Sequence, residues 1–421
     1  YYIFIDKILI FSSNLSSLFL SIKNILNYNL ELNLNAAYEY LLSSGSFEGE
    51  TLVKNIYKLE SASYLIYDLN NIEKKIYWEP NIRNDNINDL IQDSIEINKI
   101  SDVPVSIFFS GGIDSSILAY YCKNYDGIHL CTDETNYAEK IANKLNINLK
   151  KIDNCEYDVN DLEDFVKEYI QFSGEPSMAC IIPMIVCKSI QNKYKVALSG
   201  NGGDELFYGY ERTPVINLKN NSIKKIQENQ KKSLKNSYTN IDDYQFCHLF
   251  RNPENFKMNY VENLTYEQFK NKIVNKYKLN NKFDKESNYR WLELCTYVKN
   301  DLNPTLDFSS MNYGIEVRVP LLDYRLVERC LTMTSKEHID NTNINNIIDD
   351  RKIILKNILK NKLDIDLYNR QKRGFSLPSN LACEYVKLGS NSIEKLKARN
   401  IIKEVNFNKG LYSRDEIYFK N

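Results

Sequence analysis

The alternation of short apolar runs with amphipathic segments between residues 85 and 200 most constrains what this chain can fold into. Four apolar runs are typical of strands: VSIFF from residue 105, IHLCT from 128, INLKKID from 147 and KVAL from 195. The segments between them carry apolar residues at helical spacing. Strands that alternate with helices are joined by crossovers, which produce a parallel sheet covered by helices. The sequence therefore predicts a doubly wound α/β fold, followed by a largely helical part after about residue 213.

The first 80 residues are organised differently. YYIFIDKILIFSS predicts a β-hairpin, and the stretch from residue 51 to 80 predicts a second series of strands. The segments LSSLFLSIKNIL and AAYEYLLSS, which lie between them, are more helical. The chain becomes polar at Pro80, before a new amphipathic helix. With ~100–200 residues per domain, we expect a small β-rich unit over residues 1–82 and a larger domain over residues 83–421.

Charge and cysteine content narrow the classes of partner. The 54 Lys and Arg residues nearly balance the 55 Asp and Glu residues, so no global field attracts nucleic acid or an anionic membrane. The nine cysteines have no CxxC spacing, which predicts reduced thiols rather than disulfides or a zinc site. No run approaches the ~20 apolar residues that span a bilayer, and we see no secretory signal. We expect a cytoplasmic protein that binds small molecules.

The stretch SGGIDSS, residues 110–116, separates the first predicted strand from the next helix. In a parallel sheet, such a loop presents unpaired backbone N–H groups at a helix N-terminus, where anions bind. Gly111 and Gly112 let the backbone approach a phosphate, and the serine hydroxyls add donors. Asp114 beside a phosphate requires a cation between them, which implies Mg²⁺. The alternative is a Ser/Gly turn that only caps the helix.

A second loop, SGNGGDELFYGYER, follows the predicted strand KVAL at residues 199–212. It repeats the pattern of serine, glycines and carboxylates, the latter at Asp204 and Glu205. Two loops at strand exits, each with a carboxylate, can hold one metal ion between them. Taken alone, this loop is equally well explained as a structural turn.

These two loops are followed by SSMNYGIEVRVPLLDYRLVE at 309–328 and NRQKRGFSLP at 369–378. In order and spacing, the four motifs resemble the asparagine synthetase family, over roughly residues 85–380. The resemblance implies a PP-loop ATP pyrophosphatase fold. Residues 1–82 resemble the later part of the family's N-terminal glutaminase domain, an Ntn-type fold, so this unit is expected to be an incomplete glutaminase domain.

The resemblance implies ATP and Mg²⁺ as cofactors and an AMP-forming carbon–nitrogen ligase of the glutamine-hydrolysing asparagine synthase type. A substrate carboxylate would attack the α-phosphate, and ammonia or an amine would then displace AMP. Asp114 and Asp204 would bind the metal, Glu316 would face the reaction centre, and Lys372 would neutralise the phosphates. Without the motif, Lys372 is a solvated lysine and Glu316 an ion-pair partner of Arg318. The implied ATP-binding residues are Ser110, Gly111, Gly112, Asp114, Ser115, Ser199, Gly200 and Tyr210.

Three positions depart from the family pattern. Glutamine-hydrolysing members begin with a nucleophilic Cys, whereas this chain begins with Tyr1 and has its first cysteine at Cys122. We therefore expect no glutamine hydrolysis by the chain as given. Either the first part of the glutaminase domain is absent from it, or the protein takes ammonia or an organic amine directly; the missing Met favours the former. Asn201 stands where asparagine synthetases carry an acidic residue, and Phe308 where many members carry a basic one. These changes leave proton removal from the amine to Glu316, or to selection of a neutral amine.

Three functions follow from these patterns. The first is synthesis of asparagine from aspartate. The second is an amidotransferase or cyclase reaction on a sugar acid, a peptide or a β-amino acid. The third is a non-catalytic nucleotide-binding protein, which the presence of Asp114, Asp204 and Lys372 disfavours. The expected partners are a small carboxylate and an amine donor, with neither nucleic acid nor membrane, and a homodimer is a possible assembly.

Overall fold

The computed structural model of the chain describes most residues before 211 and several later segments. The described residues are 1–43, 49–69, 71–153, 157–177, 179–210, 253–279, 282–338, 351–360 and 402–405, together with Gly45, Phe47, Leu249, Phe250 and Leu363.

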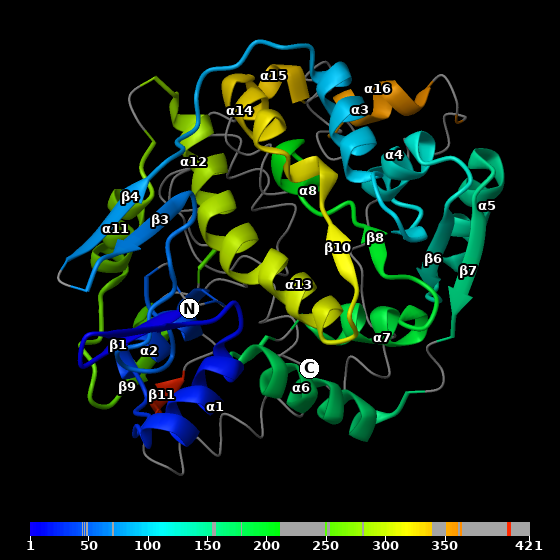
Figure 1. Ribbon diagram of the computed structural model, residues 1–421. Coiled ribbons are helices and arrows are strands. Elements are labelled where there is room, and N and C mark those ends of the chain that lie inside the picture. Colours follow the sequence, from blue (N-terminus) through cyan, green and yellow to red (C-terminus); the bar gives the residue numbers. More distant parts are fainter. Residues whose placement is uncertain are drawn as a thin grey trace.

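A five-stranded parallel sheet organises the middle of the chain (Figure 1). Its strands run in the order β10-β8-β5-β6-β7, and each neighbouring pair is parallel. The predicted α/β class with a parallel sheet is thereby confirmed. The five strands are β5 (Val105–Phe108), β6 (Asp126–Leu130), β7 (Asn148–Ile152), β8 (Val196–Leu198) and β10 (Glu316–Arg318).

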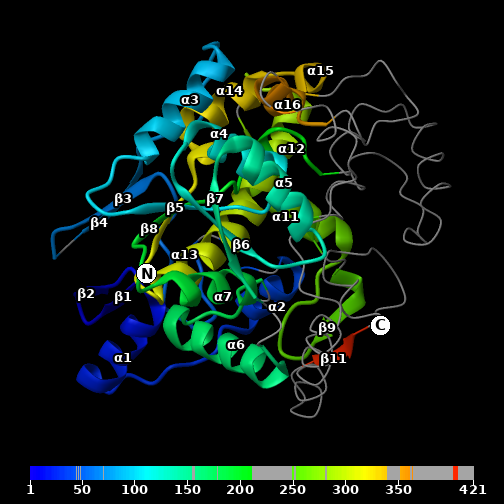
Figure 2. The ribbon, with the colours of Figure 1, turned by 90° about the vertical axis from the view of Figure 1, so that its right-hand side faces the viewer.

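Helices cover both faces of this sheet (Figures 1 and 2). On one face, Ile107 and Leu198 join an apolar core with α3 (Ile87–Asn98), α4 (Ile113–Tyr121) and α5 (Thr135–Leu145). On the other face, Ile128 and Ala197 join a second core with α6 (Val159–Ser173) and α7 (Ile181–Ile190). The neighbours Ala197 and Leu198 enter opposite cores because side chains alternate along a strand.

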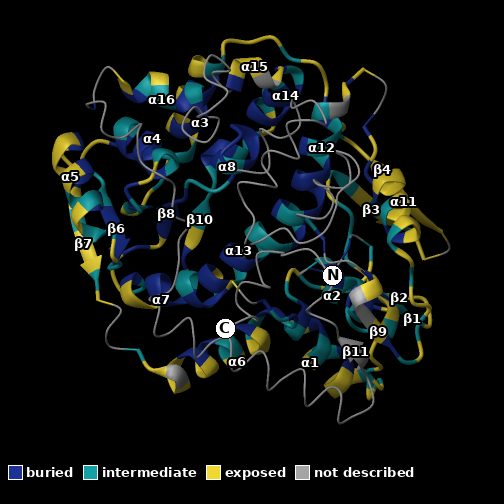
Figure 3. Cartoon of the chain, turned by 180° about the vertical axis from the view of Figure 1, so that it is seen from behind, coloured by how far each residue is buried: buried dark blue, intermediate teal, exposed yellow. Residues whose placement is uncertain are grey.

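The later part of the domain is mainly helical where the structure describes it. The short α8 (Gly203–Leu206) follows β8, and α12 (Lys285–Glu293) continues through a π-helix (Leu294–Leu302) into α13 (Asn303–Met311). A 3₁₀ turn (Pro320–Leu322) follows β10. The remaining helices are α11 (Tyr266–Lys276), α14 (Tyr324–Thr332), α15 (Ser335–His338) and α16 (Ile353–Lys360). Seen from behind, α8 is buried, whereas the outer strand β7 and helix α5 carry exposed residues (Figure 3).

Three strands in this region differ from the helical expectation. β9 (Phe256–Met258), preceded by a 3₁₀ turn (Pro253–Asn255), pairs antiparallel with β11 (Ile402–Val405). β10 was also not expected. Each of β9 and β10 has only three residues, too few for a periodic pattern, and pairing with distant chain supplies the backbone hydrogen bonds that define them.

The N-terminal unit has the predicted mixture of hairpins and helices. β1 (Tyr2–Ile5) and β2 (Ile8–Phe11) pair around a turn in which Asp6 and Lys7 have positive φ, as hairpin turns of this class require. β3 (Ser63–Tyr67) and β4 (Ile72–Ile76) form a second hairpin. α1 (Leu15–Leu26) coincides with LSSLFLSIKNIL, and α2 (Leu34–Ser43) with the other helical segment. The boundary between the units at residue 82 stays a prediction.

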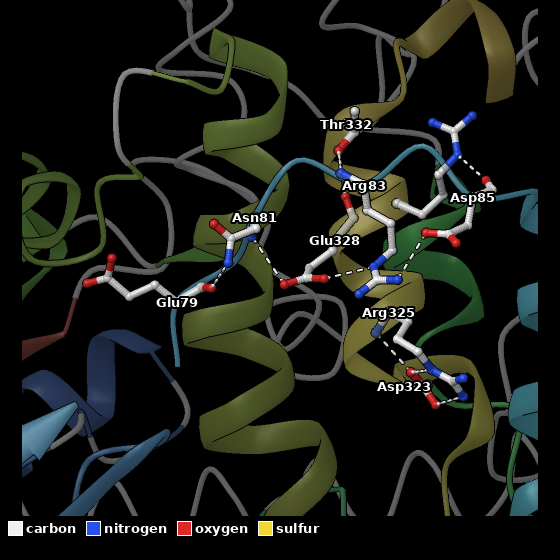
Figure 4. A network of polar contacts seen from close by, with 9 residues as sticks. Glu79, Asn81, Arg83, Asp85, Asp323, Arg325, Glu328 and Thr332 are labelled. Atoms are coloured by element: carbon white, nitrogen blue, oxygen red, sulfur yellow. Dashed lines mark hydrogen bonds and ion pairs between the residues drawn. The ribbon is translucent and has the colours of Figure 1, made fainter. Parts of the chain in front are cut away.

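Glu328 of α14 accepts hydrogen bonds from the segment that leads from β4 to α3 (Figure 4). Its carboxylate accepts from Asn81 N at 3.1 Å and from Arg83 Nε at 2.9 Å, and Arg83 N donates to Thr332 Oγ1 at 3.1 Å. The Glu328 side chain is 4% exposed. This segment is therefore bound to the larger domain by a buried carboxylate.

Among the described residues, no helix is both long enough and apolar enough to span a membrane.

Candidate active site

The two glycine-rich loops meet where the strand order reverses. β5 and β8 are hydrogen-bonded neighbours, yet the chain leaves β5 toward β6 on one side and returns to β8 on the other. In open α/β sheets, ligands bind outside the carboxyl ends of the strands at such a switch point. SGGIDSS follows β5, and SGNGGDEL follows β8. Both loops therefore lie at the position where this class of fold binds ligands.

Serine hydroxyls hold the first loop in place. Ser110 and Ser115 share a hydrogen bond of 3.2 Å between their hydroxyls, and Ser115 Oγ donates to Gly112 O at 3.1 Å. Gly111 has a φ of +77°, and a Cβ there would lie 2.8 Å from Cα of Ala138 in α5. Both the backbone conformation and the neighbouring helix exclude a side chain at this position. The N–H of Gly112, at the start of α4, donates to Ser110 Oγ at 3.3 Å, so this hydroxyl marks a position that a ligand oxygen could take.

Glycines in the second loop let it pack directly on Asp114. A Cβ at Gly200 would lie 2.9 Å from Cβ of Asp114, and one at Gly203 would lie 2.4 Å from Asp114 Oδ1. Neither contact is compatible with a larger residue. Ser199 N donates to Arg318 O at 2.8 Å, which joins this loop to the edge strand β10. The glycines of this loop therefore bring it against the aspartate of the first.

Asp114 and Asp204 share one buried ammonium group. Lys352 Nζ lies 2.6 and 2.5 Å from the two carboxylate oxygens of Asp114 and 2.6 Å from Asp204 Oδ1. Lys352 is 4% exposed. Burial alone would lower the pKa of Lys352, but the two carboxylates outweigh burial and raise this pKa above its ordinary value. The lysine is therefore charged, and the two carboxylates converge on its ammonium group; the Mg²⁺ expected between them stays a prediction.

The arrangement of Asp114 and Asp204 fits a Mg²⁺ ion. Carboxylate oxygens are the ligands that Mg²⁺ prefers, and it is commonly held by one or two carboxylates together with substrate phosphates. Among the residues that the structure describes, no group of three or more His, Cys, Asp and Glu side chains could hold a metal. A metal ion between Asp114 and Asp204 would therefore need further oxygen ligands from water or from a bound phosphate.

Sequence analysis missed Lys352. RKIILKNILK is an ordinary amphipathic helix start, in which a lysine is unremarkable, and nothing local points to partners near residues 114 and 204. The only unusual local property is conformational: Lys352 has a φ of +56°, which is rare for residues other than glycine and common at functional sites. Its neighbour Arg351 donates from Nη1 to Gly209 O at 2.6 Å. The pair thus joins the start of α16 to the second loop.

A buried carboxyl group lies beside the metal-binding candidates. Glu205 is 2% exposed, and Tyr210 donates from its hydroxyl to Glu205 Oε1 at 2.6 Å. Burial, together with the negative charges of Asp204 and Glu293, raises the pKa of Glu205 to about 7. Tyr210, expected near the adenylate, therefore uses its hydroxyl to hold Glu205.

Asn201 and Phe308, which depart from the family pattern, each contact nearby side chains. Asn201 Oδ1 accepts a hydrogen bond from Ser199 Oγ at 3.1 Å, so the side chain is held within its own loop. Phe308 of α13 packs against Tyr169 and Phe172 of α6, with ring centroids 6.5 Å apart in both pairs. An aromatic ring at position 308 thus contributes to the contact between two helices.

Glu316 stands apart from the loops. It begins β10, level with Val196 at the start of β8, whereas the glycine-rich loops follow the carboxyl ends of the strands. Its side chain is 59% exposed and pairs with Arg318 Nε at 2.8 Å. This contact is the structural ion pair left open as the alternative for Glu316. Lys372 lies outside the described residues.

Comparisons with known proteins agree with these motifs. The family model for asparagine synthase matches residues 86–401. Asparagine synthetase [glutamine-hydrolyzing] 1 of Bacillus subtilis is 26% identical over 90% of this chain and 63% of its own length. Asparagine synthetase [glutamine-hydrolyzing] 3 of the same organism is 24% identical, over 83% of this chain and 59% of its own length. The chain thus spans about three fifths of these relatives. With a family match over most of its length and both glycine-rich loops at the switch point, the chain belongs to the asparagine synthase family.

Proposed function

We propose that this chain is an ATP-dependent, AMP-forming carbon–nitrogen ligase that activates a carboxylate as an acyl-adenylate and transfers the acyl group to ammonia. Aspartate is the proposed carboxylate and asparagine the proposed product. The observation that carries the proposal is the convergence of Asp114 and Asp204 on one buried cation between two glycine-rich loops. Family membership supports the same chemistry.

The first loop would bind the departing pyrophosphate. Gly111 and Gly112 lie at the start of α4, where the helix dipole favours negative charge, and a phosphate oxygen would replace Ser110 Oγ as the acceptor of the Gly112 N–H. The hydroxyls of Ser110 and Ser115, already hydrogen-bonded to each other, can turn toward phosphate oxygens. Donors fixed before the reaction stabilise the charge that develops on the leaving oxygens, because they do not have to reorganise.

Asp114 and Asp204 would hold the magnesium ion that accompanies ATP. The ion would supply charge neutralisation to the phosphate oxygens during attack by the carboxylate. Gly200 and Gly203 pack against Asp114, and Gly209 packs against Asp204, so close neighbours hold both aspartates. Such preorganisation favours one geometry of the polyphosphate chain.

The amine is proposed to arrive as neutral ammonia rather than to be deprotonated by the second loop. Asn201 has no proton acceptor comparable to a carboxylate, and Glu316 is engaged with Arg318. Glutamine hydrolysis would need a reactive thiol. The first cysteine, Cys122, is fully buried in the core, and burial raises the pKa of its thiol to about 12. Cys122 is therefore not a candidate nucleophile for glutamine hydrolysis, and we expect ammonium salts to serve as the amine donor.

A second candidate keeps the adenylation chemistry but changes the substrate. Asn201 and Phe308 replace residues that carry charge in many members of the family; Asn201 lies in the second loop, and Phe308 directly precedes the motif at 309–328. A site with less charge would suit a carboxylate other than aspartate, such as a sugar acid, a peptide or a β-amino acid. The two candidates differ in the substrate and not in the roles of Asp114 and Asp204.

Pyrophosphate and AMP release from MgATP tests both candidates. The chain is incubated with aspartate, with a panel of other carboxylates or with none, and with ammonium or glutamine as donor. Aspartate-dependent pyrophosphate release with ammonium but not glutamine is expected. Release that depends only on another carboxylate would select the second candidate. Asp114→Asn should abolish pyrophosphate release while the circular dichroism spectrum is retained; release at the parent rate from this variant would refute the site.

A further inference from the structure

Lys352 occupies the position that a metal ion would take. Three contacts of 2.5 to 2.6 Å join its Nζ to the carboxylates of Asp114 and Asp204. The three side chains are 5%, 19% and 18% exposed, in the order Lys352, Asp114, Asp204. Two carboxylates this close and this sheltered would repel each other strongly without a cation. Among the described residues, Lys352 is therefore a charge that helps the two carboxylates to stay together when no ligand is bound.

The backbone holds this ammonium in place from both sides. Before Lys352, the guanidinium of Arg351 is hydrogen-bonded to Gly209 O at 2.6 Å; after it, Lys356 N donates to Lys352 O at 2.9 Å and begins α16. Leu355 and Leu359 of α16 are buried in the core beneath α4. Lys352 itself has the unfavourable φ of +56°, so packed neighbours maintain a strained conformation. The position of the Lys352 backbone is thus determined by the fold, and from there the side chain reaches the two carboxylates.

A divalent ion and the ammonium cannot both lie between the two carboxylates. Two cations within a few ångströms of each other in a sheltered site repel strongly, because little water separates them. An ammonium moved off the carboxylates also needs a new anionic partner, since a buried charge without one is unstable. A divalent ion that arrives alone brings no such partner, whereas one that arrives with a polyphosphate does.

We propose that Lys352 takes the place of the metal ion between Asp114 and Asp204. Its ammonium group keeps divalent ions out of this site until a polyphosphate accompanies them. The proposal rests on the proposed function, because it takes the two aspartates to be the metal ligands of the ATP site. It adds an order of binding: the nucleotide and its metal enter together, and metal alone does not bind first. Lys352 acts here as a positioning residue.

Binding of Mn²⁺ in the absence of turnover tests the proposal. Mn²⁺ is titrated, by electron paramagnetic resonance, into the full chain with and without ATP and with no carboxylate substrate. The parent chain should bind Mn²⁺ at the site only when ATP is present. Tight binding of Mn²⁺ by the parent chain without ATP, abolished by Asp204→Asn, would overturn the proposal without requiring any variant of Lys352 to fold.

Lys352→Met is the complementary variant, because it removes the ammonium and keeps much of the apolar side chain. It should gain affinity for Mn²⁺ without ATP by about tenfold or more, and Mn²⁺ should raise its melting temperature. Lys360→Met, at the exposed end of the same helix, is the matched control and should behave as the parent. A folded Lys352→Met chain with no gain in Mn²⁺ affinity would refute the proposal. A chain that shows this gain but releases no pyrophosphate with any carboxylate would contradict the proposed function alone.

Discussion

Gly209 lies so close to Asp204 that a Cβ atom on Gly209 would come within 1.8 Å of Asp204 Oδ1. The same atom would lie 2.1 Å from Cε of Lys352. The missing side chain at position 209 is therefore part of the site, because it leaves space for the carboxylate and for the lysine that pairs with it.

Gly209→Ala should displace Asp204 and Lys352 from each other. We expect a loss of stability of about 1–3 kcal/mol, as for overpacking elsewhere, and loss of Mn²⁺ binding in the presence of ATP. Urea unfolding and Mn²⁺ titration measure the two effects. Gly314→Ala is the control: its φ is +65°, and the nearest atom, Lys195 Nζ, would lie 3.9 Å away. It should lose about 1–2 kcal/mol from backbone strain and keep metal binding. Metal binding by Gly209→Ala equal to that of the parent would contradict the prediction, because it would show that the site tolerates displacement of Asp204 and Lys352.

The stability of the chain should depend on pH through Glu205. The pKa of Glu205 is raised from 4.5 to about 7 in the folded state, so between these values the folded chain binds more protons than the unfolded chain. Its contribution to stability is therefore present at low pH and is lost as pH rises from about 4.5 to 7. Glu205→Gln removes this group. We expect the free energy of unfolding of the parent, relative to that of Glu205→Gln, to fall by about 1–3 kcal/mol over this range. Parallel pH profiles for the two chains would contradict the prediction.

Tyr208→Phe should destabilise the region behind the second loop. Tyr208 is fully buried, accepts a hydrogen bond from Arg290 Nη2, and stacks on His338 at 4.8 Å between ring centroids. Removing the hydroxyl leaves a buried guanidinium N–H without this acceptor, at a cost of about 1–3 kcal/mol. Tyr64→Phe, at an exposed site of β3, should change stability by less than about 0.5 kcal/mol. Equal urea midpoints for the two variants would refute the assigned role of the hydroxyl.

Glu328→Ala should loosen the segment between β4 and α3. Asn81 N and Arg83 Nε both donate to this carboxylate (Figure 4). Arg83 is partly exposed, so water can replace part of its lost contact and the loss of stability is moderate. We expect a destabilisation of about 1–3 kcal/mol and faster proteolysis within residues 79–86. Asp93→Ala breaks the more exposed pair with Arg325, at 2.6 Å, and should leave the cleavage rate unchanged. If Glu328→Ala is cleaved no faster than the parent chain, the prediction is wrong and other contacts hold the segment.

The parallel sheet and the convergence of Asp114 and Asp204 could be predicted because they depend on patterns within short stretches. Strand–loop–helix order is visible locally, and the switch point follows from topology. Lys352 could not be predicted, because its partners are distant in sequence and its own stretch is typical of any amphipathic helix. The strand β10 was missed for a similar reason: its three residues become a strand only by pairing with β8. The role expected of Glu316 rested on a motif, and the structure gives this residue an exposed ion pair.

The distance in sequence between Asp114 and Lys352, 238 positions, has a consequence for the chain as it is made. At about 5–20 residues per second, the aspartate leaves the ribosome roughly 10–50 s before the lysine that neutralises it. During that time β5, β6, β7 and β8 are all available to pair, but Asp114 and Asp204 lack the ammonium group of Lys352. Synthesis of the stretch around residue 352 therefore supplies a positive charge that lets the two loops close on each other, so a chain that stops before residue 352 could pair these strands and still lack this contact.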